Sequence, residues 1–146
     1  MARKGVNMRV GSIFIPVTDL DRAVAWYQEH LQVNIIDRWE EGIGFYFPEG
    51  PTQFALIQVE GEPSTEFPMT KERKNVYFNF LTSDIEALQV KLRSHGVKTT
   101  ELHDFGGMLC FDAYDLDGNV LSFVNEPTDS PYHSERIRKK QSEVIL

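Results

Sequence analysis

Residues 16–33, PVTDLDRAVAWYQEHLQV, decide the fold, because the chain repeats their pattern once. Residues 81–97 read LTSDIEALQVKLRSHGV. Both stretches lead from an apolar strand end through a polar turn with an aspartate, Asp19 or Asp84, into an amphipathic helix. The two copies are separated by nearly half the chain, which is too long a period for a solenoid, whose repeats run to about 20–50 residues. The sequence therefore predicts two copies of one supersecondary module, with a site between them.

Each copy is predicted to be a βαβββ module. In the first copy, apolar residues recur at helical spacing from Leu20 to Leu31, and Thr18 or Asp19 can cap that helix. In the second, Ser83 and Glu86 resemble a capping box, and Gly96 is suited to end the helix. The predicted strands cover residues 10–17, 33–41, 43–50 and 53–60, then 76–82, 97–102, 108–114 and 120–126.

The modules are expected to occupy residues 9–60 and 76–127 of a single domain, residues 1–127. Residues 61–75 lack periodicity and are rich in Pro, Ser and Glu, which indicates a linker. Beyond Pro127 the polar residues 128–146 show no clear core face before the last three positions. This tail is predicted either to be disordered or to pack on a neighbouring subunit.

Composition excludes several classes of partner. The net charge of −7 disfavours nucleic acid, whose binding proteins need a basic face. No apolar run reaches the ~20 residues of a membrane span, and the N-terminus lacks the pattern of a signal peptide. The single cysteine, Cys110, cannot form an intrachain disulfide and is expected to be a buried apolar side chain. These features favour a cytoplasmic protein that binds neither nucleic acid nor membrane.

Two motifs resemble the vicinal oxygen chelate superfamily, which includes glyoxalase I, bleomycin-resistance proteins and extradiol dioxygenases. VTDLDRAVAWYQEHL, residues 17–31, is similar to the first-helix signature of that superfamily, and DLDGNVLSFV, residues 115–124, is similar to its last hairpin. The resemblance covers about residues 9–127. It implies an α+β fold in which two βαβββ modules form a curved mixed sheet, a half-open barrel around a cavity.

The resemblance also implies four positions for metal ligands, one on each of four strands. In this chain these positions fall on Ser12, Tyr77, Ser122 and Ala55, with Ile57 or Gln58 in place of Ala55 if the register slips. Two serine hydroxyls, one phenol and an aliphatic side chain offer no carboxylate or imidazole to a divalent ion. We therefore expect no metal and no cofactor.

Without a metal, the inward strand positions define the predicted ligand pocket. They combine aromatic walls with a few polar groups, the usual character of a small-molecule site. A filled core without ligand is the competing interpretation, and a slip of one residue would exchange each set for its neighbours. The predicted ligand-binding residues are Ser12, Phe14, Trp39, Phe45, Tyr77, Asn79 and Ser122, with Phe47 and Val124 beside them.

Catalytic residues are harder to assign. His103 lies in HDFGG, residues 103–107, a predicted loop at the entrance to the strand 108–114, where it could serve as an acid or base with Asp104. A plain surface loop is the competing interpretation. Asp115 and Asp117 are expected to stabilise the hairpin turn rather than to form a pair of catalytic carboxylates.

Three functions remain open from the sequence. The first is a metal-free protein that sequesters an aromatic or drug-like molecule, as a homodimer like the bleomycin-resistance proteins it resembles. The second is a lyase, isomerase or dioxygenase with a displaced metal site or with acid–base groups such as His103 and Tyr77. The third is a non-catalytic module that binds another protein. Stoichiometric binding without product would distinguish the first function from the second.

Overall fold

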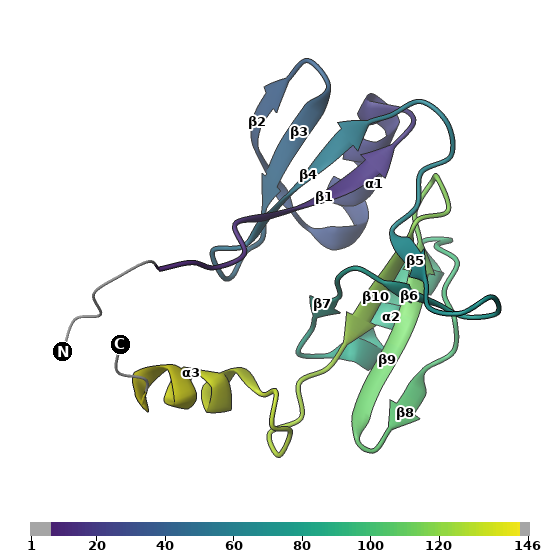
Figure 1. Cartoon of the computed structure of the whole chain (residues 1–146). Helices are drawn as coiled ribbons and strands as arrows, with labels where there is room; N and C mark the ends of the chain where they lie inside the picture. Colours follow the sequence, from purple (N-terminus) through teal and green to yellow (C-terminus); the bar gives the residue numbers. More distant parts are fainter. Residues whose placement is uncertain (1–6, 144–146) are drawn as a thin grey trace.

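A computed structural model describes residues 7–143 and contains the two predicted modules (Figure 1). In the first module the sheet order is β1-β4-β3-β2, with β1 and β4 parallel and the other pairs antiparallel. A single helix, α1, covers one face of this sheet. Its elements are β1 Ser12–Val17, α1 Leu20–Leu31, β2 Asn34–Trp39, β3 Gly42–Tyr46 and β4 Gln53–Gln58.

The second module repeats this order around α2, with the sheet order β7-β10-β9-β8. Here β7 and β10 are parallel, and β10, β9 and β8 are antiparallel neighbours. The predicted α+β fold is thus confirmed, with an open mixed sheet in each module. The elements are β7 Phe80–Leu81, α2 Ile85–Ser94, β8 His103–Phe105, β9 Met108–Tyr114 and β10 Val120–Val124.

Aspartates cap both helices. The Asp19 carboxylate accepts from the backbone N–H of Arg22, and that of Asp84 accepts from Ala87, each at 3.1 Å. The predicted capping box at Ser83 is therefore wrong, since Asp84 occupies the cap and satisfies the free donor itself. Gly96 ends the second helix at φ +79°, a left-handed conformation that favours glycine.

Three segments differ from the sequence prediction. The linker is not wholly irregular, because β5 Glu66–Pro68 and β6 Lys74–Val76 form a small hairpin. In place of a strand at 97–102 there is one isolated bridge, Thr99 to Ala113, and the strand that pairs with β9 is β8. Residues of the polar tail form a helix, α3 Ser134–Glu143, in which no residue is buried.

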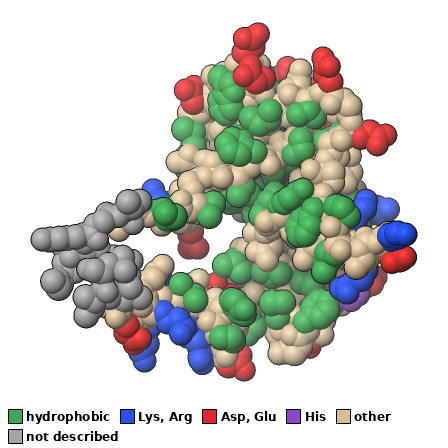
Figure 2. Space-filling view, viewed as in Figure 1, with side chains coloured by type: hydrophobic (Ala, Val, Ile, Leu, Met, Phe, Trp, Pro, Cys, Tyr) green, Lys and Arg blue, Asp and Glu red, His purple; other side chains and the backbone are tan. Residues whose placement is uncertain are grey.

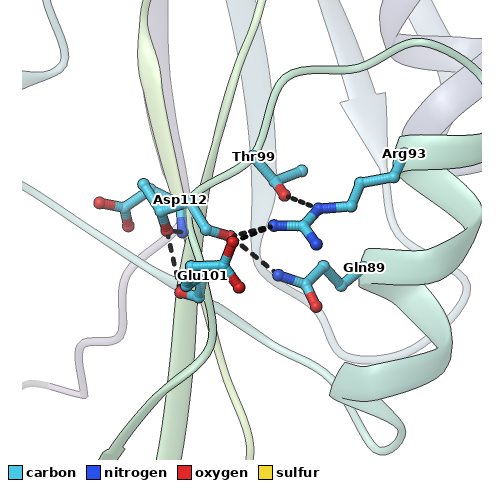
Figure 3. A network of polar contacts seen from close by, with 6 residues as sticks. Gln89, Arg93, Thr99, Glu101 and Asp112 are labelled. Atoms are coloured by element: carbon cyan, nitrogen blue, oxygen red, sulfur yellow. Dashed lines mark hydrogen bonds and ion pairs between the residues drawn. The ribbon is translucent and has the colours of Figure 1, made fainter.

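The segment between α2 and β8 is held by polar contacts instead of strand pairing (Figure 3). Gln89 Nε2 donates to the Thr100 carbonyl at 2.8 Å, and Arg93 Nε donates to Thr99 Oγ1 at 2.7 Å. Thr100 in turn exchanges two hydrogen bonds with the Asp112 backbone. These contacts tie α2 to β9 and explain why the segment has a fixed course without being a strand.

One hydrophobic core joins the two modules. It lies between the sheets and their helices, and Phe47 bridges the halves by contacting Phe54 and Phe80, with ring centroids 5.3 and 5.7 Å apart. In Figure 1 both helices lie behind their sheets, so the uncovered faces of the two sheets turn toward the same side of the molecule. We call these uncovered surfaces the open faces. No helix within residues 7–143 has the length and hydrophobicity to cross a membrane.

A buried polar network also joins the modules. The Tyr27 hydroxyl on α1 donates to the Asp115 carboxylate at 2.6 Å, and Asn119 Nδ2 donates both to that carboxylate and to the Pro16 carbonyl. Burial, followed by the charge of Asp115, raises the pKa of Tyr27 well above its usual value, so the phenol stays protonated and donates. Asp115 therefore does more than stabilise the hairpin turn, which was its predicted role: it also connects α1 of the first module to the last hairpin.

The C-terminal ends of α1 and α2 meet at two histidines. The rings of His30 and His95 lie 6.1 Å apart, and His30 is only 8% exposed. Burial is the main factor that lowers the pKa of His30; His95 and Lys91 act in the same direction, while Glu29 opposes them. The fold therefore favours the neutral imidazole.

This contact predicts a loss of stability in mild acid. Because the pKa of His30 is lower in the folded than in the unfolded state, its neutral form stabilises the protein fully above the unfolded value of about 6.5. The free energy of unfolding should fall as the pH drops from there through the folded pKa. Urea unfolding at a series of pH values measures this slope. His30→Gln should flatten it, and an unchanged slope in that variant would contradict the assignment.

Candidate functional site

The open face of the first sheet follows from strand alternation. Ile15 on β1 is fully buried toward α1, whereas Ser12 and Phe14 point the other way, with Phe14 61% exposed. The register places Phe14 beside Ala55 of β4 on the same face. This surface therefore contains an exposed aromatic ring and a hydroxyl group, from two residues of the predicted ligand site.

Trp39 lies across a strip of glycines on this open face. A Cβ built on Gly42 would come within 2.3 Å of Trp39 Cζ2, and one on Gly44 would lie 3.8 Å from Cζ3. The Ile57 side chain borders the same place, 3.0 Å from the Cβ position of Gly42. Since Trp39 is still 42% exposed, its indole is held against the sheet with part of its surface available to a ligand.

Gly42→Ala should displace this indole. The φ angle of Gly42 is not in the left-handed region, so the cost is the steric overlap with Trp39 rather than backbone strain. We expect a red-shifted tryptophan emission and a loss of stability of roughly 1–3 kcal/mol, the usual cost of overpacking. Gly44→Ala, which has ordinary contact distances, is the matched control and should change neither. Identical spectra for all three proteins would contradict this placement of Trp39.

The open face of the second sheet has a different chemical character. Ser122 pairs with Asp112, and Cys110 pairs with both Val124 and His103, so these side chains share a face. In Figure 3 the Asp112 carboxylate points away from Gln89 and Arg93. Burial, and secondly Asp112, raise the pKa of the Cys110 thiol, which makes it a poor nucleophile.

Three predicted ligand-binding residues are not placed where the sequence analysis expected. Phe45 is fully buried beneath α1 and stacked on Phe54 at 4.9 Å, so the prediction that it shares a face with Trp39 is wrong. Tyr77 and Asn79 lie between β6 and β7, outside both main sheets. Tyr77 is 68% exposed, and its ring contacts Phe67 of β5 at 5.0 Å.

His103 is exposed, and it belongs to β8 rather than to a loop. Its expected partner, Asp104, accepts from the Gly107 N–H at 2.7 Å and so closes the β8–β9 turn. As neighbours along one strand, His103 and Asp104 point to opposite faces. The structure thus gives His103 no acid–base partner in Asp104.

Comparison with known proteins identifies the family. The family model described as "Glyoxalase/Bleomycin resistance protein/Dioxygenase superfamily" matches residues 9–123. The chain belongs to this superfamily. No curated protein matches the sequence.

Solved structures of the superfamily fold agree. The antibiotic binding protein TnmS3 from Streptomyces sp. CB03234 superposes with a TM-score of 0.67 at 17% identity, over 84% of this chain and 98% of that one. A superfamily member from Sphaerobacter thermophilus DSM 20745 gives 0.67 at 22% identity, over 82% and 98%. Lactoylglutathione lyase from Agrobacterium tumefaciens gives 0.63 at 14% identity, over 82% and 94%. At these identities the likeness concerns the fold.

The four positions that the resemblance implies for metal ligands carry no carboxylate or imidazole side chain. Ser12 and Ala55 lie on the first open face and Ser122 on the second, while Tyr77 is outside the sheets. These side chains supply neutral hydroxyls and a methyl group, which are poor partners for a divalent ion. Among residues 7–143, no group of three or more His, Cys, Asp or Glu side chains could hold a metal ion.

The strip of glycines that holds Trp39 was not predicted from the sequence. The signal was present in GIG, residues 42–44, because glycine inside a strand pattern marks a bulge or a close approach of another group. Tyr46, on the same face by register and 46% exposed, was missed as well. Tyr46 extends the aromatic surface that Phe14 and Trp39 form.

Proposed function

We propose that this superfamily member is a metal-free protein that binds and sequesters an aromatic or drug-like small molecule. The observation that carries the proposal is the indole of Trp39, held against Gly42 and Gly44 with part of its surface exposed. An aromatic ring fixed in this way can stack on a planar ligand without losing side-chain freedom on binding.

Phe14 and Tyr46 extend the apolar surface of the first open face, and Ser12 adds a hydroxyl that can orient a polar group on the ligand. Ser122 and Asp112 supply a hydroxyl and a carboxylate on the second open face. Apolar walls with a few polar groups are typical of small-molecule sites. The net charge of −7 favours a cationic ligand over an anionic one.

The proposal includes a homodimer, in the cytoplasm. In one chain both open faces expose large apolar side chains, including Phe14 at 61% and Leu81 at 59%. Exposed apolar surface of this kind marks interaction sites. A second copy that covers part of these faces would turn shallow surfaces into enclosed ligand sites.

A screen of a fixed library of aromatic antibiotics, including metal-free bleomycin, tests the proposal. EDTA-treated protein is mixed with each compound, and native mass spectrometry records which are retained and whether their masses change. We expect retention of at least one compound, unchanged in mass, and loss of it from Trp39→Ala but not from Trp26→Phe. Conversion of a compound, or its retention only after a divalent ion is added, would favour a lyase, isomerase or dioxygenase instead.

A further inference from the structure

The helix α3 is the feature that this chain adds to its family's domain. The family model ends at residue 123. The three solved structures described above align over 94–98% of their own length but over only 82–84% of this chain. No residue of α3 is buried, and Figure 1 shows it extending away from both modules. A helix of ten residues is marginal by itself in water, so α3 needs a surface to pack against.

The start of α3 is fixed to a residue that follows β10. The Glu126 carboxylate, just beyond β10, accepts from the backbone N–H and the hydroxyl of Ser134 at 2.9 and 2.7 Å. Hydrogen bonding to Ser134 is the main factor that lowers the pKa of Glu126. His133 Nε2 lies 3.4 Å from the same carboxylate. These contacts of Glu126 set the direction in which α3 leaves the two modules. We call α3 the arm.

The arm is basic in an acidic protein. The helix α3 contains four basic and two acidic residues, a net charge of +2. Since the whole chain carries −7, the rest of it carries −9. Arg138 pairs with Glu135 inside the helix. Within the part of the chain that the structure describes, Arg136, Lys139 and Lys140 take part in no ion pair. Arg136 and Lys140 share a helix face, and Ile137 lies one turn from Lys140.

A complementary surface lies on the first module. Residues 34–66 contain seven acidic residues and a single basic one, Arg38, which is paired with Asp21. The edge strand β2 is exposed along its whole length, with Ile36 48% exposed, and Glu40 and Glu41 form the turn that follows it. Figure 2 shows acidic side chains around the first module and basic ones on the arm.

We propose that α3 docks on the β2 edge and the Glu40–Glu41 turn of a second copy of the chain. The arm cannot reach this surface in its own chain while Glu126 holds its start, since α3 and the β2–β3 turn lie at opposite ends of the molecule (Figure 1). In a pair of chains, Lys139 and Lys140 meet Glu40 and Glu41, and Ile137 covers exposed apolar surface of β2. The negative charge of the chain outside the arm disfavours a nucleic acid or an anionic membrane as the partner.

Charge reversal on each side tests this docking. Lys139→Glu/Lys140→Glu alters the arm, Glu40→Lys/Glu41→Lys alters the acidic turn, and Lys71→Glu/Arg73→Glu is a control of matched charge on the β5–β6 hairpin. Sedimentation velocity at low salt gives the dimer dissociation constant of each full-length protein. We expect each test variant to weaken self-association at least 10-fold, and the control to change it less than 3-fold.

Two combinations separate the possible contacts. A 1:1 mixture of the arm variant and the turn variant restores opposite charges only between chains, and should associate as tightly as wild type. The four substitutions together in one chain should do the same. Restoration in the single chain but not in the mixture would mean that α3 binds its own chain, and would overturn the proposal.

The inference rests on the proposed homodimer, and the same data distinguish the two failures. Wild-type self-association that neither test variant changes would overturn the arm contact and leave the homodimer standing. A wild-type protein that stays monomeric at every concentration would overturn both. At protein concentrations well above each variant's dimer dissociation constant, retention of the library compounds should be unchanged in both test variants, because neither the arm nor the turn belongs to the open faces.

Discussion

Asp115→Ala is expected to lower the free energy of unfolding by about 3–5 kcal/mol, because several donors lose one shared acceptor. The carboxylate is 7% exposed and accepts from the Tyr27 hydroxyl, from Asn119 Nδ2 and from two backbone N–H groups of the turn. Removing it deprives the buried Tyr27 hydroxyl and the buried Asn119 N–H of this acceptor and disconnects α1 from the last hairpin. Equilibrium urea unfolding measures the loss.

Asp104→Ala is the matched control for this experiment. Asp104 also closes a turn, by accepting from the Gly107 N–H, but it is exposed. Water can replace its single contact, so we expect a loss of about 0.5–1 kcal/mol. Equal losses in the two variants would contradict the view that the Asp115 network holds the modules together.

Trp39→Ala is expected to weaken binding of a retained aromatic ligand by roughly 30-fold, which corresponds to about 2 kcal/mol for an exposed aromatic anchor. The reason is the loss of a ring that is already held in place by Gly42 and Ile57. Because Trp39 is 42% exposed, stability should fall by only about 1 kcal/mol or less. Isothermal titration calorimetry with the strongest library compound gives the change in affinity.

Trp26→Phe provides the comparison, since Trp26 lies on α1 against Tyr27 and His30, away from the open face. This variant should bind the ligand as wild type does. Phe14→Ala, on the same face as Trp39, should produce an intermediate loss. Equal affinities for wild type and Trp39→Ala would place the ligand elsewhere on the molecule.

The sequence contains strong signals for the repeated parts of the fold. In α1 the apolar residues recur at the spacing of a helix face, and the observed bounds match the predicted ones. Asp19, one of the two predicted candidates, caps the first helix, and Asp84, directly after the predicted Ser83, caps the second. Such local patterns depend only on neighbouring residues, which is why they could be predicted.

The sides of strands were harder to predict than the strands themselves. Phe45 and Trp39 were expected to share a face, but Trp39 pairs with Gly42, and Phe45 lies three residues further along β3, beside the buried Phe54. Because side chains alternate along a strand, Phe45 points to the opposite face from Gly42 and Trp39. Aromatic composition cannot reveal this, since both faces of the first sheet carry aromatic side chains.

Segments that depend on distant partners were also missed. Residues 97–102 look like a strand, yet Gln89 and Arg93 of α2 hold this segment through side-chain contacts instead. The α3 helix has no apolar face within Ser134–Glu143 to indicate it, and its start depends on Glu126, eight residues earlier. Here tertiary contacts, rather than local preference, decide the structure.

Metal-free binding is tested by the binding isotherm of the strongest library compound, measured before and after EDTA treatment and again after addition of Ni²⁺, Zn²⁺, Mn²⁺ or Fe²⁺. We expect dissociation constants that agree within about twofold in every condition, with the compound recovered unchanged. Binding that disappears with EDTA and returns with a divalent ion, or turnover of the compound, would contradict a metal-free binding protein.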